Sequence, residues 1–341
     1  SGQEFWRVYR EQFLPPWQTS QTQLAALTGA GVAVPIPLAA SDGEAYVTVE
    51  VPDDGAGMAR HTRHAGLTRW IPGQVLANLI DASGDPAQIA GWYRQLGAML
   101  GRLHRQASAW TPPPGFTRHR FDADGLLGER PFWGRFWENP ALSPAQRRLL
   151  DQARHRLRDQ LDTQGRDPLR FSMIHADLHP GNVVVDGDRI AVIDFDDAGF
   201  GHHLYDLAVA LGRPGSEPLP AAVWEATLAG YRTEHLLSDE EAAEIPHFEL
   251  LRSLALIGWK ADRPEVAWPD GMFDRLLAAN TIGTCAMLLL AVMGFLTGRP
   301  DFLDLALVYG LLNILGTIAV LKYFRHGDLG DPGETEESSA P

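Results

Sequence analysis

The stretch FSMIHADLHPGNVVVDGDRIAVIDFDDAGFG, residues 171–201, constrains the fold more than any other part of this sequence. Apolar runs at 173–174, 183–185 and 191–193 alternate with a polar loop and with Asp186-Gly187, a dipeptide typical of hairpin turns. The pattern predicts a strand, a loop, and then two strands joined by a tight turn. Such a hairpin brings polar side chains from the loop and from the end of the last strand to one edge.

The polar residues of this stretch predict a phosphoryl-transfer site. His175, Asp177 and Asn182 are spaced as HxDxxxxN, and Asp194 ends the returning strand. Moving a γ-phosphoryl group requires a carboxylate that orients the attacking hydroxyl and hard oxygen ligands that hold Mg²⁺ against the phosphates. Asp177 suits the first role, and Asn182 and Asp194 suit the second. The sequence therefore predicts an ATP- and Mg²⁺-dependent phosphotransferase.

With these residues the stretch resembles the catalytic loop of the aminoglycoside phosphotransferase and choline kinase group, relatives of the protein kinases. The resemblance covers about residues 1–262. It implies that His175 fixes the loop, that Asp177 is the catalytic base, and that Asn182 and Asp194 bind the metal and the nucleotide phosphates. Asp206, in LYDLAVAL, resembles the buried aspartate that ties down the loop backbone in this family.

Several other polar residues nearby are assigned simpler roles. For His179, Asp196 and Asp197 we favour a structural or solvated role. His202 and His203 are interpreted as the polar start of a helix, because no third ligand stands at a spacing typical of a metal site.

Two further segments are interpreted as structural. The aromatic run FWGRFWENP, beginning at 132, is predicted to be a core cluster rather than a platform for stacking a sugar. Ser238 and Glu241 form a capping box, so the acidic run that begins there is best explained as the start of a helix.

The first seventy residues are expected to form a small, nucleotide-facing lobe. EFWRVYR and AYVTVEV are predicted strands, and a predicted helix between them ends at 29–31. Arg7 stands where the family places a basic residue that binds the α- and β-phosphates, although an ordinary role on a strand surface is an equal alternative. No glycine-rich loop precedes it, and the helix offers neutral amides such as Gln23 where the family has a glutamate. The lobe is therefore expected to be truncated, which leaves a pseudokinase-like binding module as an alternative.

The composition of the sequence changes after WKADRPEVAWPD, which ends at residue 270. Residues 281–298 and 305–321 contain no charged side chain and are predicted to form a transmembrane hairpin; a buried soluble helix pair is the alternative. Basic residues outside both spans place both ends in the cytoplasm. This part resembles the F component of the multi-protein Mrp-type sodium/proton antiporters, which implies antiporter subunits as partners.

The predicted architecture is α+β. It combines a protein-kinase-like two-lobed fold, with a truncated N-terminal lobe and a mainly helical C-terminal lobe, and an all-α transmembrane-type hairpin. The domains are expected at 1–69, 70–264 and 265–326, followed by a disordered acidic tail at 327–341.

The composition argues against one class of binding partner and indicates a cellular compartment. A net charge of −14 argues against nucleic acid, and a single cysteine suits a reducing cytoplasm. The leading hypothesis is a kinase acting on a hydroxyl of a small molecule, cytoplasmic but attached to the inner membrane by the hairpin. A membrane-embedded antiporter subunit with a kinase-like passenger is a further alternative. Aminoglycoside, choline, a homoserine-like alcohol and protein serine all remain compatible with the loop.

Overall fold

The computed structural model describes residues 4–10, 14–44, 47–51, 61–140, 142–212 and 219–261. The chain divides into two compact units, residues 1–265 and 266–341, and every described residue belongs to the first. The predicted hairpin at 281–298 and 305–321 and the acidic tail lie outside the described residues. Among the described helices, none combines the length and the apolar character needed to cross a bilayer.

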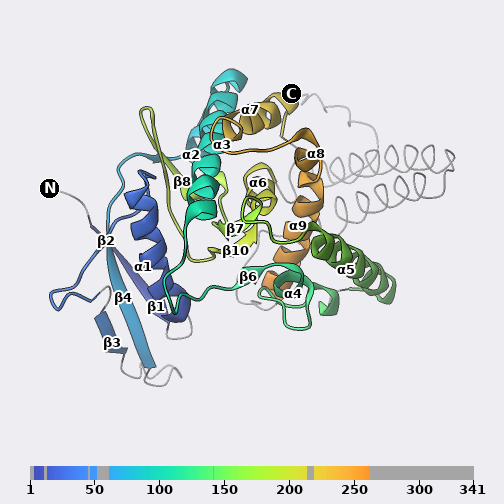
Figure 1. Ribbon diagram of the computed structural model, residues 1–341, viewed down its shortest axis with the longest axis horizontal. Helices are drawn as coiled ribbons and strands as arrows, with labels where there is room; N and C mark the ends of the chain where they lie inside the picture. The colour runs from blue at the N-terminus through green and yellow to red at the C-terminus, as the bar shows by residue number, and fades with distance from the viewer. Residues whose placement is uncertain are drawn as a thin grey trace, which may run out of the picture. The chain divides into compact units, whose positions relative to one another are not determined.

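An antiparallel sheet and one helix form the N-terminal part (Figure 1). Its elements are β1 (Glu4–Arg10), α1 (Leu14–Gly29), β2 (Pro37–Leu38), β3 (Val47–Val51) and β4 (His61–Arg69). The long strand β4 lies at the centre and pairs with each of the other three. The predicted strands at the start of the chain and near residue 50, and the helix ending at Gly29, are confirmed.

The remaining described residues form a mainly helical part with two small sheets. Its elements are β5 (Gln74–Val75), α2 (Leu76–Ala82), α3 (Pro86–Ala109), β6 (Arg120–Phe121), α4 (Ala123–Leu127), η2 (Phe136–Glu138), α5 (Pro144–Gln164), β7 (Phe171–Ile174), η3 (Pro180–Asn182), β8 (Val183–Asp186), β9 (Arg189–Val192), β10 (Gly199–His202), α6 (His203–Leu211), α7 (Ala221–Tyr231), α8 (Asp239–Ala242) and α9 (Ile245–Ala261).

The predicted strand, loop and hairpin are present as β7, η3, β8 and β9. β8 and β9 pair antiparallel from Val183 opposite Val192 to Asp186 opposite Arg189, and Gly187 adopts the positive φ of 58° that the tight turn requires. β5 adds to the other edge of β8. Gly73 makes this approach possible, because a Cβ there would lie 2.5 Å from the Val185 carbonyl oxygen.

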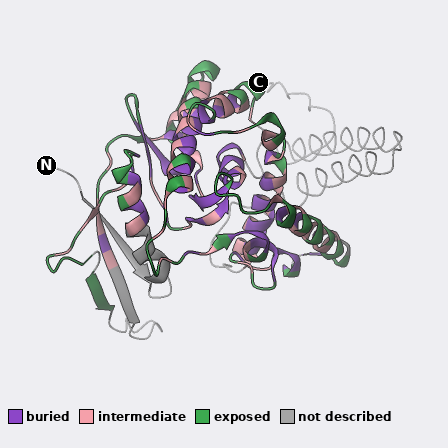
Figure 2. Cartoon of the chain, in the orientation of Figure 1, coloured by how far each residue is buried: buried purple, intermediate pink, exposed green. Residues whose placement is uncertain are grey.

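The core beneath the loop is built on close contact between α3 and α7. The two helices lie side by side (Figure 1). A Cβ at Gly97 would lie 2.0 Å from the Thr227 carbonyl oxygen, and one at Gly230 would lie 1.9 Å from the Arg94 carbonyl oxygen. Figure 2 shows buried residues along α3 and α6, whereas α5 is largely exposed.

A backbone hydrogen bond joins the N-terminal part to the hairpin. The Val192 amide, at the end of β9, donates to the Ala33 carbonyl oxygen at 3.0 Å. The segment that follows α1 is thereby held against the strand that leads to Asp194.

Candidate active site

The loop after β7 is held by Asp206, which projects from the first turn of α6 and is fully buried. Its carboxylate oxygens accept hydrogen bonds from the backbone amides of His175 at 2.9 Å and Ala176 at 2.6 Å. Ala176 has a φ of 66°, a conformation unfavourable for a residue with a Cβ. The contacts expected of the aspartate in LYDLAVAL are therefore present, and they hold the residue before Asp177 in a strained conformation.

His175 links this loop to the returning strand. Its Nε2 donates to the Ile193 carbonyl oxygen at 2.9 Å, and its Nδ1 accepts from the Asp177 amide at 3.3 Å. One ring nitrogen donates and the other accepts, as in a neutral imidazole. Burial lowers the pKa of His175 against the opposing influence of the Asp206 carboxylate, which agrees with this assignment. The histidine therefore connects the loop to the residue that precedes Asp194.

Asp177 and Asn182 are in direct contact. The Asn182 Nδ2 donates to the backbone oxygen of Asp177 at 2.9 Å and to its Oδ2 at 3.2 Å. Because the amide nitrogen is used in this way, the carbonyl oxygen of the Asn182 side chain remains available as a ligand. A neutral oxygen beside carboxylates is a donor set that Mg²⁺ accepts, so these residues fit the expected metal.

Asp194 directly follows Ile193, the residue that His175 contacts, and also has a φ of 66°. The amide of Ile193 donates to the Asn182 backbone oxygen at 3.0 Å, which ties the two candidate metal ligands together through the main chain. The segment after Asp194 is fixed from the other side: Arg118 donates to the backbone oxygens of residues 195 and 196, and His119 to that of residue 197.

Arg252 of α9 belongs to this site, although it lies outside the motif that predicted the other residues. Its guanidinium forms an ion pair with Asp177 Oδ1. Burial alone would raise the pKa of Asp177, but the neighbouring His179 imidazole and the Arg252 guanidinium hold that pKa below its usual value. Asp177 is therefore ionised at neutral pH, as a base that orients a hydroxyl must be.

Two residues assigned solvated or structural roles also belong to this site. His179 Nδ1 accepts from the Gly181 amide at 3.0 Å, and its Nε2 lies 3.6 Å from Asp177 Oδ2. Burial, with the Asp177 carboxylate nearby, raises the pKa of Asp197 to about 6. Asp196 is exposed, as expected of a solvated residue. Asp197 instead adds a partly buried carboxyl group beside the base.

His202 and His203 lie at the start of a helix, as predicted: His202 ends β10 and is the N-cap of α6, and His203 is the first residue of that helix. Both are buried, because β10 pairs with β7 and α9 brings Phe248 against His202. Their pKa values are lowered by burial. His203 stacks on His104, whose Nε2 lies 3.0 Å from Asp206 Oδ2.

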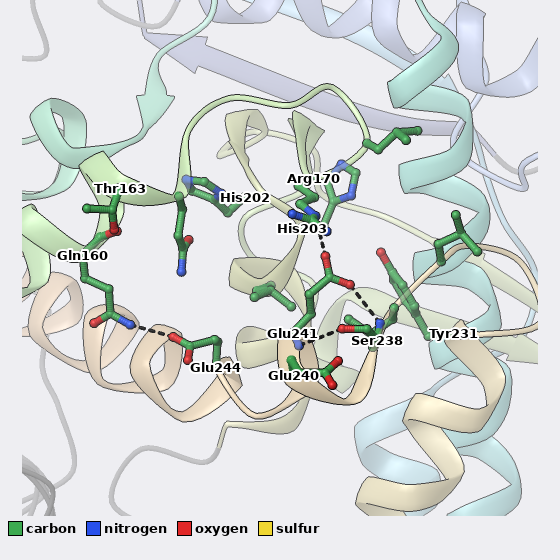
Figure 3. Close-up of a pocket in the computed structure, with 15 residues that line it drawn as sticks. Gln160, Thr163, Arg170, His202, His203, Tyr231, Ser238, Glu240, Glu241 and Glu244 are labelled. Carbon is green, nitrogen blue, oxygen red and sulfur yellow. Dashed lines mark hydrogen bonds and ion pairs between the residues drawn. The ribbon is translucent and has the colours of Figure 1, made fainter. Parts of the chain in front are cut away.

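A cavity of about 660 Å³ lies at these histidines. Figure 3 shows Arg170 paired with Glu241, and Gln160 bonded to Glu244, among its lining residues. Asp177, Asn182 and Asp194 do not line it. The cavity is therefore separate from the candidate active site.

The aromatic run and the capping box behave as expected. Trp133, Phe136 and Trp137 are buried, whereas Phe132 is 42 % exposed. Ser238 and Glu241 form both bonds of a capping box at the start of α8.

Arg7 and Gln23, singled out in the N-terminal part, lie in its sheet and in its helix. Arg7 lies in β1 opposite Gly66 of β4, but its side chain is outside the described residues. Gln23 of α1 is buried, and its Oε1 has no hydrogen-bond partner among the described residues. The role of Arg7 stays a prediction.

Two families of known proteins match this chain in sequence. The phosphotransferase enzyme family (APH) matches residues 16–244. Multiple resistance and pH regulation protein F (MrpF / PhaF) matches residues 273–325, which include both uncharged segments.

Individual relatives agree with the first match. An uncharacterized protein of Deinococcus radiodurans is 30 % identical over 273 residues, which cover 75 % of this chain and 70 % of that protein. Homoserine kinase of Neisseria meningitidis serogroup B is 31 % identical over 160 residues, 44 % of this chain and 47 % of the kinase. The chain thus spans about half the length of that relative.

The fold agrees as well. The structure of a microcompartment-associated aminopropanol kinase superposes with a TM-score of 0.69 and 29 % identity, and the alignment covers 87 % of each chain. The predicted resemblances, the two-lobed fold and the predicted enzyme class are confirmed at this level. The phosphotransferase match covers more than half of the residues of this chain, and the chain therefore belongs to the phosphotransferase enzyme family.

Proposed function

We propose that this protein is an ATP- and Mg²⁺-dependent kinase that phosphorylates a hydroxyl group of a small amino alcohol, with Asp177 as the base. The observation that carries the proposal is the Asn182 Nδ2 bond to Asp177 Oδ2, supported by the bond from the Ile193 amide to the Asn182 backbone oxygen, which joins the residue before Asp194 to the same loop. Phosphoryl transfer is catalysed mainly by positioning and by charge stabilisation, and this arrangement provides both.

Each residue has a distinct part in the proposed reaction. Ionised Asp177 accepts a hydrogen bond from the acceptor hydroxyl, aims its oxygen at the γ-phosphorus and receives the proton as the new bond forms, while the bond from the γ-phosphorus to the oxygen bridging to the β-phosphate breaks and ADP leaves with that oxygen. Asn182 and Asp194 would hold the metal, and a bound Mg²⁺ would neutralise charge on the nucleotide phosphates. Asp206 and His175 keep the loop in the conformation that presents these groups.

The amino-alcohol acceptor is supported by two relatives and by the charges at the site. One relative is named homoserine kinase and another aminopropanol kinase. Both of these alcohols carry an ammonium group a few bonds from the hydroxyl. Asp197 places a further, partly buried carboxyl group beside Asp177. Because Arg252 offsets the charge of Asp177, the attraction for a positively charged acceptor would come from Asp197.

The test is acceptor-dependent release of ADP by the full chain with Mg²⁺. L-homoserine, 1-amino-2-propanol and choline are compared with 1,2-propanediol, which has hydroxyls but no amine. We expect turnover with at least one amine and about 100-fold less with Asp177→Asn, because a positioned base contributes 10²–10⁴-fold. Turnover should also stop when EDTA removes the metal.

The same assay separates the alternatives. If ATP and Mg²⁺ bind but no acceptor is phosphorylated, the chain is the pseudokinase-like binding module. If Asp177→Asn turns over as fast as the wild-type protein, Asp177 is not the base. If 1,2-propanediol is phosphorylated as fast as the amines, the enzyme does not select an amino alcohol.

A second proposal concerns the C-terminal segment. We infer that residues 273–325 attach the protein to the inner membrane beside antiporter subunits, leaving the kinase-like part in the cytoplasm. The match to MrpF / PhaF and the two uncharged segments support this inference. Membrane fractionation of the full chain and of a chain ending at Pro264 tests it. If both are recovered without detergent in the soluble fraction, the inference is wrong.

A further inference from the structure

Arg252 lies in α9, beyond residues 16–244 that match the phosphotransferase enzyme family. Its side chain is only 11 % exposed although it carries a full charge. A buried guanidinium is costly unless each part of it finds a partner. The partners of Arg252 therefore indicate what it does.

The guanidinium touches the catalytic loop at two adjacent residues. Its Nη2 donates to Asp177 Oδ1, and its Nη1 lies 3.5 Å from the Ala176 backbone oxygen. One planar group thus contacts the proposed base and the strained residue before it. Ala176 is held on its amide side by Asp206 and approached on its carbonyl side by Arg252.

The face of the guanidinium rests on an aromatic ring. Its Cζ lies 4.3 Å from the centre of the Trp133 ring, a cation–π contact. Gly258 makes this contact possible, because a Cβ there would lie 2.6 Å from the Trp133 backbone oxygen and 2.5 Å from that of Gly134. Six residues after Arg252, α9 therefore comes into direct contact with the backbone that carries the tryptophan.

The two oxygens of Asp177 receive donors from two different elements. Arg252 of α9 reaches Oδ1, and Asn182 of η3 reaches Oδ2. Rotation of the carboxylate about its Cβ–Cγ bond would break both contacts. Each oxygen keeps a second lone pair, so the carboxylate can still accept from an incoming hydroxyl.

We propose that Arg252 is a positioning residue for the phosphoryl-transfer reaction: clamped on Trp133, it fixes the orientation of the Asp177 carboxylate toward the acceptor hydroxyl. The proposal rests on the function proposed above for Asp177. It requires an arginine, because lysine has neither the planar fork that reaches two neighbouring groups nor the flat face that stacks on a ring.

The chain contains a matched control. Arg154 of α5 also stacks on a tryptophan, with its Cζ 3.8 Å from the centre of the Trp137 ring, and pairs with Glu129. Neither the tryptophan on which it stacks nor the glutamate with which it pairs belongs to the catalytic loop. Substituting Arg154 removes a stacked arginine of the same kind from the same part of the protein.

The experiment compares Arg252→Gln and Arg252→Lys with Arg154→Gln and Arg154→Lys in the full chain. The first readouts are kcat and the KM values for ATP and for the acceptor found in the screen above. A further readout is the rate of ADP release in the absence of acceptor. For Arg252→Gln we expect kcat to fall about 100-fold, the scale of a misplaced catalytic group, while KM for ATP stays within about threefold. Arg252→Lys should recover only part of the loss, and both Arg154 variants should keep the wild-type kcat.

Acceptor-free ADP release distinguishes positioning from a general structural role. A disturbed fold would lower release with and without acceptor together and would raise KM for ATP. A misaligned base lowers the acceptor-dependent rate more strongly. If Arg252→Gln does not fold, as judged by circular dichroism, Trp133→Leu is used, since it removes the ring beneath the guanidinium and leaves both charges; it should lower kcat with KM for ATP unchanged.

Different results overturn different claims. If the wild-type protein shows no acceptor-dependent turnover, the proposed function fails, and with it the role of Arg252. If the wild-type protein is active but the Arg252 variants behave like the Arg154 variants, only the positioning role is wrong. Equal loss of both activities, or full rescue by Arg252→Lys, also contradicts it.

Discussion

Protonation of His202 should destabilise the fold in mild acid. This residue ends β10 as the N-cap of α6, is 5 % exposed, and contacts Phe171, at a ring distance of 5.0 Å, and Phe248, at 5.7 Å. Burial lowers the pKa of its imidazole to about 4; Asp122 opposes this shift and Arg166 adds to it. The unfolded chain leaves the same imidazole in water, with a pKa of about 6.5.

The sign and size of the effect follow from proton linkage. Between these two pKa values the unfolded chain binds the proton and the folded chain does not, so stability falls as the pH falls. A pKa lowered by about 2.5 corresponds to roughly 3 kcal/mol in full, of which about 2 kcal/mol is lost between about pH 8 and about pH 5. Other buried histidines, among them His104 and His203, also have lowered pKa values and add to the total loss.

The substitution His202→Gln isolates this contribution, because glutamine cannot take up the proton. Urea unfolding followed by intrinsic fluorescence gives the free energy of unfolding at about pH 8 and about pH 5. At the higher pH the variant should be less stable than the wild-type protein by about 1–2 kcal/mol, because it loses ring packing. At the lower pH this difference should shrink by about 2 kcal/mol or change sign.

The same substitution at His155, on the exposed side of α5 with 67 % of its side chain accessible, controls for the change of residue type. If the difference between wild-type protein and His202→Gln is the same at both pH values, the imidazole is protonated equally in the folded and unfolded chains. The reasoning from burial would then be refuted.

Two further predictions concern the loop and its support. Asp206→Asn should lower kcat about 100-fold with little change in KM for ATP, because an amide offers one oxygen where two backbone N–H groups need acceptors; steady-state kinetics with circular dichroism as a folding control checks this. An unchanged kcat would show that the loop does not depend on Asp206. Gly230→Ala should destabilise the fold by about 1–3 kcal/mol, because its Cβ would lie 1.9 Å from the Arg94 carbonyl oxygen and push α3 from α7. Thermal unfolding measures the loss, and Gly84→Ala, where no atom lies within 4 Å of the added Cβ, is its control.

The parts of the site that are local in sequence could be predicted. The strands β7, β8 and β9, the turn at Gly187 and the contact of Asp177 with Asn182 all follow from spacing within one short stretch. Backbone geometry limits where such a hairpin can place its ends. Asp206 lies close enough in the chain for a family motif to include it.

The parts that depend on packing between distant segments could not be predicted. Arg252 is 75 residues from Asp177, and a pattern of apolar spacing indicates only that α9 is amphipathic. One signal was present: Arg252 lies among Phe248, Leu251 and Ala255 on the buried face, where an unpaired charge would be costly. The burial of His202 and His203 could not be predicted for the same reason, because the residues that bury them come from other elements.

Ala176 and Asp194, which flank the site, both have a left-handed backbone conformation, and this conformation limits which substitutions are tolerated there. In that backbone conformation a side chain branched at Cβ is strongly disfavoured, whereas glycine and asparagine fit without difficulty. A library randomised at codon 176 and selected for function should therefore return small or amide side chains and almost no valine, isoleucine or threonine. The amino acids tolerated at position 176 are therefore determined by one torsion angle rather than by the chemistry of the side chain.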